Sequence, residues 1–191
     1  LINRTKEKIK NSLSKFYWVC PLIEESEELD LKAAEERYKI LKKYFKDKVL
    51  LMHGRLSEIE KEEIMTKFKN EDYKILVSTT VIEVGVDIPS ATTIVIEHAE
   101  RFGLAQLHQL RGRVGRNDIQ SYCILLHKDN IGEISKKRIE IMKQTNDGFK
   151  IAEEDLKIRG PGEILGKKQS GSPSFYVADL SFDYDLLEDA K

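Results

Sequence analysis

The chain has 191 residues, of which 40% are hydrophobic and 34% charged, a composition that suits a folded domain with one buried core and excludes a largely disordered chain. Its formal net charge of −1 excludes an overall basic field, so any contact with nucleic acid must come from a local patch. No apolar run is long enough to cross a bilayer, and Cys20 and Cys123 lie in apolar runs rather than at metal-ligand spacing; we therefore expect a cytoplasmic protein with buried, reduced thiols and no metal site.

The first part of the chain alternates helical and strand patterns. A polar helical pattern over 6–14 precedes the apolar run 16–20, which Pro21 closes and which is typical of a strand buried on both faces. A helix over 29–46 and a strand over 48–52 follow. Ser57 and Glu60 form a capping box, because each side chain can satisfy a free backbone N–H at a helix start. This helix is predicted to reach about Asn70 and to bury Ile59, Ile64, Met65 and Phe68.

Three more strands are predicted over 73–78, 93–97 and 121–126. Strands that alternate with helices at this spacing indicate an α/β fold with a parallel sheet, flanked by helices on both faces. Ligands of such sheets bind at the carboxyl ends of the strands. Two unusual segments, 79–87 and the arginine run that ends at Arg116, were both expected directly after strands, so we predict that they share one rim of the sheet.

After Leu126 the strand pattern stops. Two helical segments, about 131–145 and 149–158, are joined by a short polar connection and predict an antiparallel hairpin. Arg159 and the glycines and proline that follow it end the second helix. Residues 163–171 are expected to form a short helix or turn, and the tail 172–191 to pack back on the domain. We therefore divide the chain into a sheet domain over 1–128 and a C-terminal hairpin and tail over 129–191.

The segment Gln109–Arg116 has the most specific chemistry. It carries three arginines within six residues, spaced by glycines and with no acidic residue among them. The guanidinium fork binds phosphate oxygens bidentately, and glycine lets backbone and ligand approach closely. The segment predicts a clamp for a nucleotide phosphate. The alternative is a basic surface turn that binds nothing.

The order of these segments resembles the C-terminal motor domain of a superfamily-2 helicase. Residues 79–87 (Thr-Thr-Val-Ile-Glu-Val-Gly-Val-Asp) resemble motif V, and 109–116 resemble motif VI in its Gln-x-x-Gly-Arg-x-Gly-Arg form. The resemblance extends over almost the whole chain and implies a RecA-like sheet and an ATP-dependent DNA helicase that remodels stalled replication forks in recombination and repair. The transcription-repair coupling factor, a translocase with the same two motifs and hairpin, is the alternative. Lys15-Phe16 departs from the family's usual glutamine and alanine, a change expected at the surface edge and without functional consequence.

The resemblance also implies roles for residues near the nucleotide. Arg116 and Arg113 would be arginine fingers that stabilise charge on the transferred phosphoryl group, and Gln109 would contact the phosphates. Gly85 would admit the nucleotide closely, and Asp87 would accept a hydrogen bond from a ribose hydroxyl. Asp87 could instead be a turn residue before a proline.

Other positions are implied in DNA binding and coupling. Thr79 and Thr80, at a strand end, suit contacts with DNA phosphates. Arg138, Arg159 and Gln169 would belong to a translocation hairpin that couples ATP hydrolysis to movement on DNA. The alternative is that Arg138 lies on a solvated helix face and Arg159 caps a helix end.

Three conspicuous side chains keep structural interpretations. His98 and His108 have no carboxylate or cysteine at metal spacing and are expected to pack or to hydrogen-bond. Trp18 lies in a strand that is expected to be buried, which favours a core position over a platform for stacked bases.

Two ATPase motifs are missing from the sequence. It contains neither a Gly-x-x-x-x-Gly-Lys-Ser/Thr phosphate loop nor an Asp-Glu-x-His/Gln magnesium motif. We therefore expect a piece of a longer protein that supplies half of an ATPase site for ATP and Mg2+. The Mg2+ ligands, a second RecA-like domain and a wedge domain would lie upstream in the parent chain. Branched DNA and replication forks would be its partners, with no membrane partner; a stand-alone nucleic-acid-binding module is the second possibility.

Overall fold

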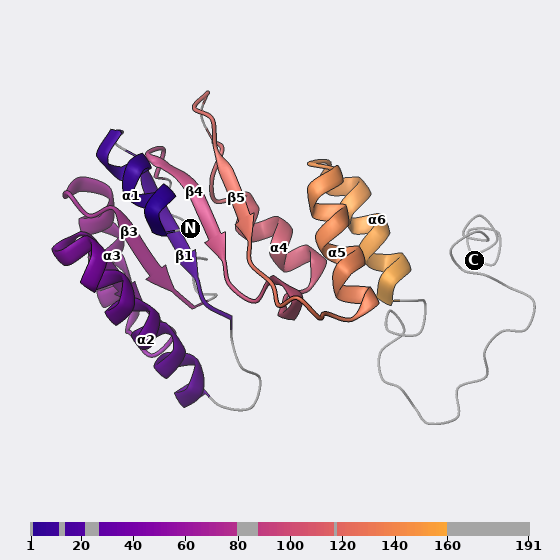
Figure 1. Ribbon diagram of the computed structural model, residues 1–191, viewed down its shortest axis with the longest axis horizontal. Coiled ribbons are helices and arrows are strands. Elements are labelled where there is room, and N and C mark those ends of the chain that lie inside the picture. The colour runs from indigo at the N-terminus through magenta and orange to yellow at the C-terminus, as the bar shows by residue number, and fades with distance from the viewer. Residues whose placement is uncertain (1, 12–13, 22–26, 80–87, 117, 160–191) are drawn as a thin grey trace, which may run out of the picture.

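The structure is a computed structural model that describes residues 2–11, 14–21, 27–79, 88–116 and 118–159. Figure 1 shows a sheet with helices on either side and a pair of helices beyond its last strand. In chain order the elements are α1 (Ile2–Asn11), β1 (Lys15–Val19), α2 (Glu27–Phe45), η1 (Lys46–Lys48), β2 (Val49–Met52), α3 (Glu58–Asn70), β3 (Ile75–Ser78), β4 (Ala91–Ile96), η2 (Ala99–Arg101), α4 (Leu104–Arg111), β5 (Tyr122–Leu125), α5 (Glu133–Gln144) and α6 (Gly148–Arg159).

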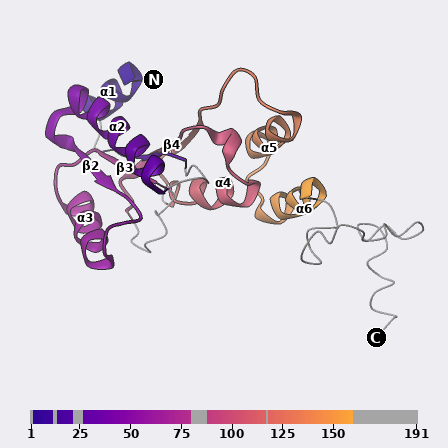
Figure 2. The same ribbon diagram turned by 90° about the horizontal axis from the view of Figure 1, so that it is seen from below.

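The five strands form one parallel sheet in the order β2-β3-β1-β4-β5, which confirms the predicted α/β architecture. All five residues of the central strand β1 are buried, as its apolar sequence predicts. Alternate side chains of the strands point to two cores. Tyr17 and Val19 pack with α3, α4 and the α5–α6 pair, whereas Phe16 and Trp18 pack with α1 and α2 (Figure 2).

The start of α3 confirms the capping box. The backbone N–H of Ser57 donates to the Glu60 carboxylate at 2.8 Å, and the Glu60 N–H donates to the Ser57 hydroxyl at 3.3 Å. The prediction that Ile59 is buried is wrong, because its side chain is 71% exposed. Ile59 lies two and a half turns before the buried Phe68 and therefore on the opposite side of the helix. Met65 is also buried and Ile64 packs against the same core, as expected.

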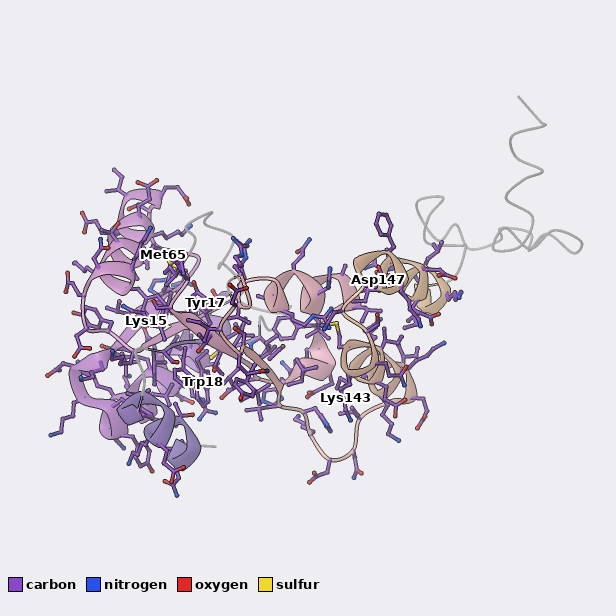
Figure 3. All side chains as sticks on the ribbon, turned by 90° about the horizontal axis from the view of Figure 1, so that it is seen from above. Lys15, Tyr17, Trp18, Met65, Lys143 and Asp147 are labelled. Carbon is purple, nitrogen blue, oxygen red and sulfur yellow. The ribbon has the colours of Figure 1, made fainter. Side chains whose placement is uncertain are left out.

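Lys15 corrects the expectation of a neutral change at the surface edge. Lys15 and Phe16 lie within β1 and are 6% and 1% exposed. The Lys15 ammonium reaches the end of α3, where it donates to the carbonyl oxygens of Phe68, Lys69 and Glu71, the last two at 3.3 and 2.8 Å (Figure 3). The carbonyls of Phe68 and Lys69 lie in the last turn of α3 and have no partner within that helix, and Glu71 directly follows it, so the ammonium caps α3 from the sheet. Burial, followed by the charge of Lys74, lowers the pKa of Lys15.

Replacing Lys15 by methionine is expected to lower the free energy of unfolding by about 1–3 kcal/mol. Methionine keeps the apolar stem but leaves the carbonyls at the end of α3 without a donor. Urea unfolding followed by circular dichroism measures the change. Lys67→Met, at an exposed position of the same helix, is the matched control. Equal stability of the two variants would contradict a capping role for Lys15.

The C-terminal hairpin is present as predicted. Helices α5 and α6 run antiparallel, joined by residues 145–147, and both lie beside α4 (Figures 1 and 2). Its turn is held by Asp147, whose carboxylate accepts from the backbone N–H of Phe149 at 2.9 Å. Ile139, Met142 and Ile151 belong to the same buried cluster as one face of the sheet. The hairpin therefore packs on the sheet domain, and the division at residue 128 stays a prediction.

Candidate functional site at the arginine run

Helix α4 positions the arginine run. It buries Leu104, Leu107 and Leu110 against the sheet and ends at Gly112. The chain then turns at Gly115, which has a φ of +78°, and leads into β5. A side chain there would adopt a strained left-handed conformation and would lie 3.7 Å from the Cβ of Ser121. The glycine thus allows the run to fold back onto the start of the last strand.

The prediction that residues 79–87 and the arginine run share one rim of the sheet rests on a wrong premise, namely that both segments directly follow strands. The arginine run does not follow a strand directly, because η2 and α4 lie between β4 and the run. Thr79 follows the carboxyl end of β3, whereas the run leads to the amino end of β5, and β1 and β4 separate these two strands in the sheet. The described residues therefore do not bring Thr79 and the arginines together.

Three predicted phosphate ligands lie on the last turn of α4 and just beyond it. Gln109 and Arg116 are exposed and Arg113 is half-buried. The Nε of Arg116 donates to the carbonyl oxygen of Gly112 at 3.0 Å, which holds the base of its guanidinium near the helix end. Among the described residues, no hydrogen bond or ion pair involves the Arg113 side chain. A guanidinium without a partner among the described residues can donate its hydrogen bonds to an anionic ligand.

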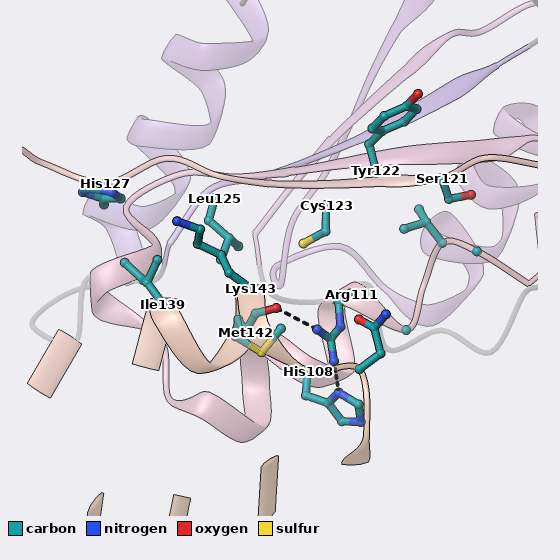
Figure 4. Close-up of a pocket in the computed structure, with 14 residues that line it drawn as sticks. His108, Arg111, Ser121, Tyr122, Cys123, Leu125, His127, Ile139, Met142 and Lys143 are labelled. Carbon is teal, nitrogen blue, oxygen red and sulfur yellow. Dashed lines mark hydrogen bonds between the residues drawn. The ribbon is translucent and has the colours of Figure 1, made fainter. Parts of the chain in front are cut away.

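Arg111 has a different role from the other two arginines. Its Nη1 donates to the carbonyl oxygens of Met142 and Thr145 at 2.9 and 2.8 Å, and its Nη2 lies 3.0 Å from the Nδ1 of His108 (Figure 4). Burial lowers the pKa of Arg111. The prediction of one clamp with three equivalent arginines is therefore corrected, since Arg111 is bound to the hairpin.

Arg111 lies in a cleft of about 890 Å³ between α4, β5 and α5 (Figure 4). Cys123 faces this cleft from β5, and burial raises the pKa of its thiol to about 11. Burial, followed by the charge of Glu97, raises the pKa of Cys20 to about 12. Both thiols are free, as expected, and both are protonated at neutral pH. Cys20 is buried, whereas Cys123 is partly exposed.

Several predicted site residues lie outside the described part of the chain: Thr80, Gly85, Asp87 and Gln169. Thr79 is described and is 2% exposed. Its backbone N–H donates to the carbonyl oxygen of Met52 at 3.4 Å, and its buried hydroxyl has no hydrogen-bond partner among the described residues. A DNA contact of the Thr79 hydroxyl would require the end of β3 to open.

The two hairpin arginines are not joined to each other. Arg159 forms an ion pair with Asp155 at 2.9 Å, and its Nη2 would lie 3.8 Å from a Cβ at Gly103. Arg138 is half-buried, and its Nε has no hydrogen-bond partner among the described residues. Asp155 is 8% exposed and its Oδ1 likewise has no described partner. Sequence reasoning missed Asp155, although its spacing of four residues from Arg159 predicts an ion pair on one helix face.

The aromatic and histidine predictions are confirmed. Trp18 is 2% exposed, and its indole N–H donates to the Glu97 carboxylate at 2.7 Å. The same carboxylate forms an ion pair with Arg37 at 2.6 Å. The ring nitrogen of His98 contacts Glu100 at 3.1 Å, and His108 contacts Arg111. These contacts make each side chain part of the packing.

The described residues hold no cluster of three or more His, Cys, Asp or Glu side chains that could bind a metal ion. Nor does the part of the chain that the structure describes contain a helix long and apolar enough to span a membrane.

Two family models match this chain, each over a different part of it. Residues 5–118 match the family model of the helicase conserved C-terminal domain, and 145–191 match that of the C-terminal part of domain 3 of the ATP-dependent DNA helicase RecG. The chain is 54% identical to RecG of Bacillus subtilis over 92% of its own length and 26% of the relative's. It is 56% identical to RecG of Aquifex aeolicus, over 95% of this chain and 23% of the relative.

Solved structures agree with these matches. A structure of RecG bound to a three-way DNA junction is 47% identical, with a TM-score of 0.69, over 97% of this chain and 24% of that one. The C-terminal domain of the DEAD-box protein Dbp5 is 19% identical with a TM-score of 0.53, over 82% of this chain and 91% of that one, which shows a shared fold alone. The chain therefore spans about a quarter of the RecG relatives that it matches.

Proposed function

The chain belongs to the helicase conserved C-terminal domain family and matches RecG helicases over nearly its whole length, and from this we propose that it is the second motor domain of an ATP-dependent DNA helicase. In this proposal the parent enzyme remodels stalled replication forks and branched DNA in the cytoplasm during recombination and repair. The three-way DNA junction bound in the RecG structure supports branched DNA as the substrate class.

The observation that carries the proposal is the pair Arg113 and Arg116, presented beyond a packed helix by the turn at Gly115. When bound, ATP with Mg2+ supplies the phosphoryl group that is transferred to water. The two guanidiniums would neutralise negative charge on the phosphate oxygens, with Gln109 one turn earlier as a further phosphate contact. Their charge is permanent and their positions are set by α4 before the ligand arrives.

The remaining motif V residues complete the proposed nucleotide and DNA contacts. Gly85 would allow the nucleotide to approach the backbone, and Asp87 would accept a hydrogen bond from the ribose. Thr79 and Thr80 would contact DNA phosphates. The family match over residues 5–118 includes all four positions and supports these assignments.

The hairpin is proposed to couple hydrolysis to movement on DNA through Arg138, Arg159 and Gln169. Two arginines cannot hydrogen-bond to each other, because both are donors. A carboxylate is needed between them, and Asp155 already pairs with Arg159. The Oδ1 of Asp155 and the Nε of Arg138, neither of which has a hydrogen-bond partner among the described residues, lie on the two antiparallel helices, each about two turns from their connection. We propose that Asp155 bridges both arginines when the motor closes.

The proposed partners are an upstream RecA-like domain, which would hold the phosphate loop and Mg2+ ligands, and a wedge domain of the same parent chain. Two other functions are considered: the corresponding domain of a transcription-repair coupling factor, and a stand-alone nucleic-acid-binding module. The RecG-type model that matches residues 145–191 favours the fork-remodelling helicase over the coupling factor.

The 191-residue chain by itself is expected to hydrolyse no ATP, because it lacks the phosphate loop and the magnesium carboxylates. Phosphate release from the purified chain, with and without forked DNA, tests this. Adding the upstream part of the parent as a separate polypeptide is the positive control and should restore turnover. DNA-stimulated turnover by the chain alone would contradict the half-site proposal. Any weak DNA binding by the chain should decrease as salt is added, since phosphate contacts release counterions.

A further inference from the structure

We propose that Arg111 and His108 are positioning residues that lock the α5–α6 hairpin onto helix α4, so that the arginine run and the hairpin move as one rigid unit. The inference rests on the proposed function, because it identifies the side chains that connect the phosphate-binding arginines to the DNA-coupling hairpin. It assigns to Arg111 a role distinct from that of Arg113 and Arg116.

The contact begins at the C-terminal end of α5. The carbonyl oxygens of Met142 and Thr145 lie at a helix end, where carbonyls lack partners in their own helix and carry partial negative charge. The Nη1 of Arg111 donates to both, at 2.9 and 2.8 Å. A guanidinium from one helix thus caps another helix, in the position where a C-terminal glycine or water would otherwise serve.

His108 fixes the other side of the guanidinium. Its Nδ1 lies 3.0 Å from the Nη2 of Arg111, which has no lone pair to offer, so Nδ1 must accept and the ring proton of the neutral tautomer lies on Nε2. That nitrogen faces the first residue of α6, because a Cβ added to Gly148 would lie 3.0 Å from it. The imidazole therefore lies between Arg111 and the start of α6, close enough that a Cβ at 148 would push on it by a few tenths of an ångström.

Three contacts are spread along the whole of α4. Arg159, at the end of α6, lies beside Gly103 before the first turn of α4. His108 contacts the start of α6 in the middle of α4, and Arg111 caps α5 from the last turn. Because these contacts span the length of the short helix, α4 cannot tilt or translate without carrying both hairpin helices. Gly112 directly follows Arg111 in the chain. The backbone that carries Arg113 and Arg116 is therefore joined to the unit formed by α4, α5 and α6.

Arg111 already uses three of its five N–H donors within the protein, two on the end of α5 and one on His108. Withdrawing the side chain would leave two carbonyl oxygens at the end of α5 without a donor. Arg111 therefore stays with the hairpin while the two later arginines meet the nucleotide.

The test uses the full-length parent helicase with Arg111→Ala, Arg111→Lys and Gly148→Ala. Lysine keeps the charge but replaces the planar fork, in which Nη1 meets the two carbonyls and Nη2 the imidazole, by a single ammonium that cannot reproduce this geometry. Gly148→Ala removes no hydrogen-bonding group and favours the helix, yet its Cβ would lie 3.0 Å from the Nε2 of His108 and is expected to push the imidazole away from Arg111. Lys143→Ala, an exposed residue of the same cleft, is the matched control. Base pairs unwound per ATP hydrolysed, kcat and KM for ATP, and Tm are measured for each.

The ratio of base pairs unwound to ATP hydrolysed is expected to fall about tenfold for Arg111→Ala and for Gly148→Ala, within the usual range of coupling between sites. The ratio for Arg111→Lys should lie between the ratios of these two variants and that of wild type, and the ratio for Lys143→Ala should equal that of wild type. The KM for ATP should be unchanged, because Arg111 does not touch the nucleotide. An unchanged ratio in Gly148→Ala and Arg111→Lys, or a KM that rises with each Arg111 substitution, would overturn the proposal even if Arg111→Ala fails to fold.

This outcome is separable from failure of the proposed function. If Arg116→Ala leaves ATP turnover intact, the phosphate-binding assignment fails whatever Arg111 does. If Arg116→Ala abolishes turnover but the Arg111 and Gly148 variants keep a normal ratio of unwinding to hydrolysis, the helicase assignment stands and the positioning role is wrong.

Discussion

Replacing Arg116 by alanine in the full-length parent helicase is expected to lower kcat for ATP hydrolysis by roughly three to five orders of magnitude, the contribution of an arginine finger in phosphoryl transfer. Nucleotide binding should remain largely intact. The guanidinium acts mainly on charge that develops in the transition state, and interactions of that kind change kcat rather than ground-state affinity. Arg116 is exposed and lies beyond the end of α4, where its Nε donates to the carbonyl oxygen of Gly112, so α4 has no need to rearrange.

Two measurements are needed for Arg116→Ala: steady-state ATPase with saturating forked DNA, and equilibrium binding of a fluorescent ATP analogue. Lys39→Ala is the matched control, because Lys39 is an exposed cation of α2, which packs on the opposite face of the sheet. Arg113→Ala should resemble Arg116→Ala if the two act as a pair. A loss of nucleotide affinity with unchanged turnover would contradict the finger assignment and would make Arg116 a simple binding residue.

Alanine at Arg138, Arg159 or Gln169 is expected to abolish fork unwinding while most of the DNA-stimulated ATPase activity remains. None of the three is expected to contact the nucleotide, so hydrolysis should continue. Arg159 lies at the end of α6, where it pairs with Asp155 and contacts the start of α4. Its loss would release the end of α6 from the start of α4, and closure around ATP would no longer reach the DNA.

Asp155→Asn tests the same prediction at the carboxylate that pairs with Arg159. The amide keeps the size of the side chain but removes its charge, so it should weaken the ion pair with Arg159 and reproduce the loss of unwinding. Lys137→Ala, next to Arg138 but exposed, is the control and should unwind forks normally. ATPase and unwinding that fall in proportion, in any of these variants, would show that the hairpin is scaffold or part of the hydrolysis site rather than a coupling device.

Local features of the fold followed from the sequence by itself. The buried strand 16–20, the capping box at Ser57 and the hairpin after residue 131 were each predicted and are present. Each depends on residues close together in the chain: an apolar run, a side chain three positions from its partner, or helical periodicity interrupted by turn residues. The arginine run was also identified from spacing, because glycines between arginines are visible without a structure.

Only the tertiary structure decided which side chains contact elements that are distant in the chain. Lys15 belongs to a strand but caps α3, more than fifty residues away in sequence. Ile59 is exposed because the sheet covers the other side of its helix. Arg111 and Arg113 have the same side chain two positions apart, yet Arg111 caps α5 whereas Arg113 makes no hydrogen bond or ion pair with the described residues. Sequence spacing predicts which residue types are available; the packing of α4 between the sheet and the hairpin determines which of them remains available for a ligand.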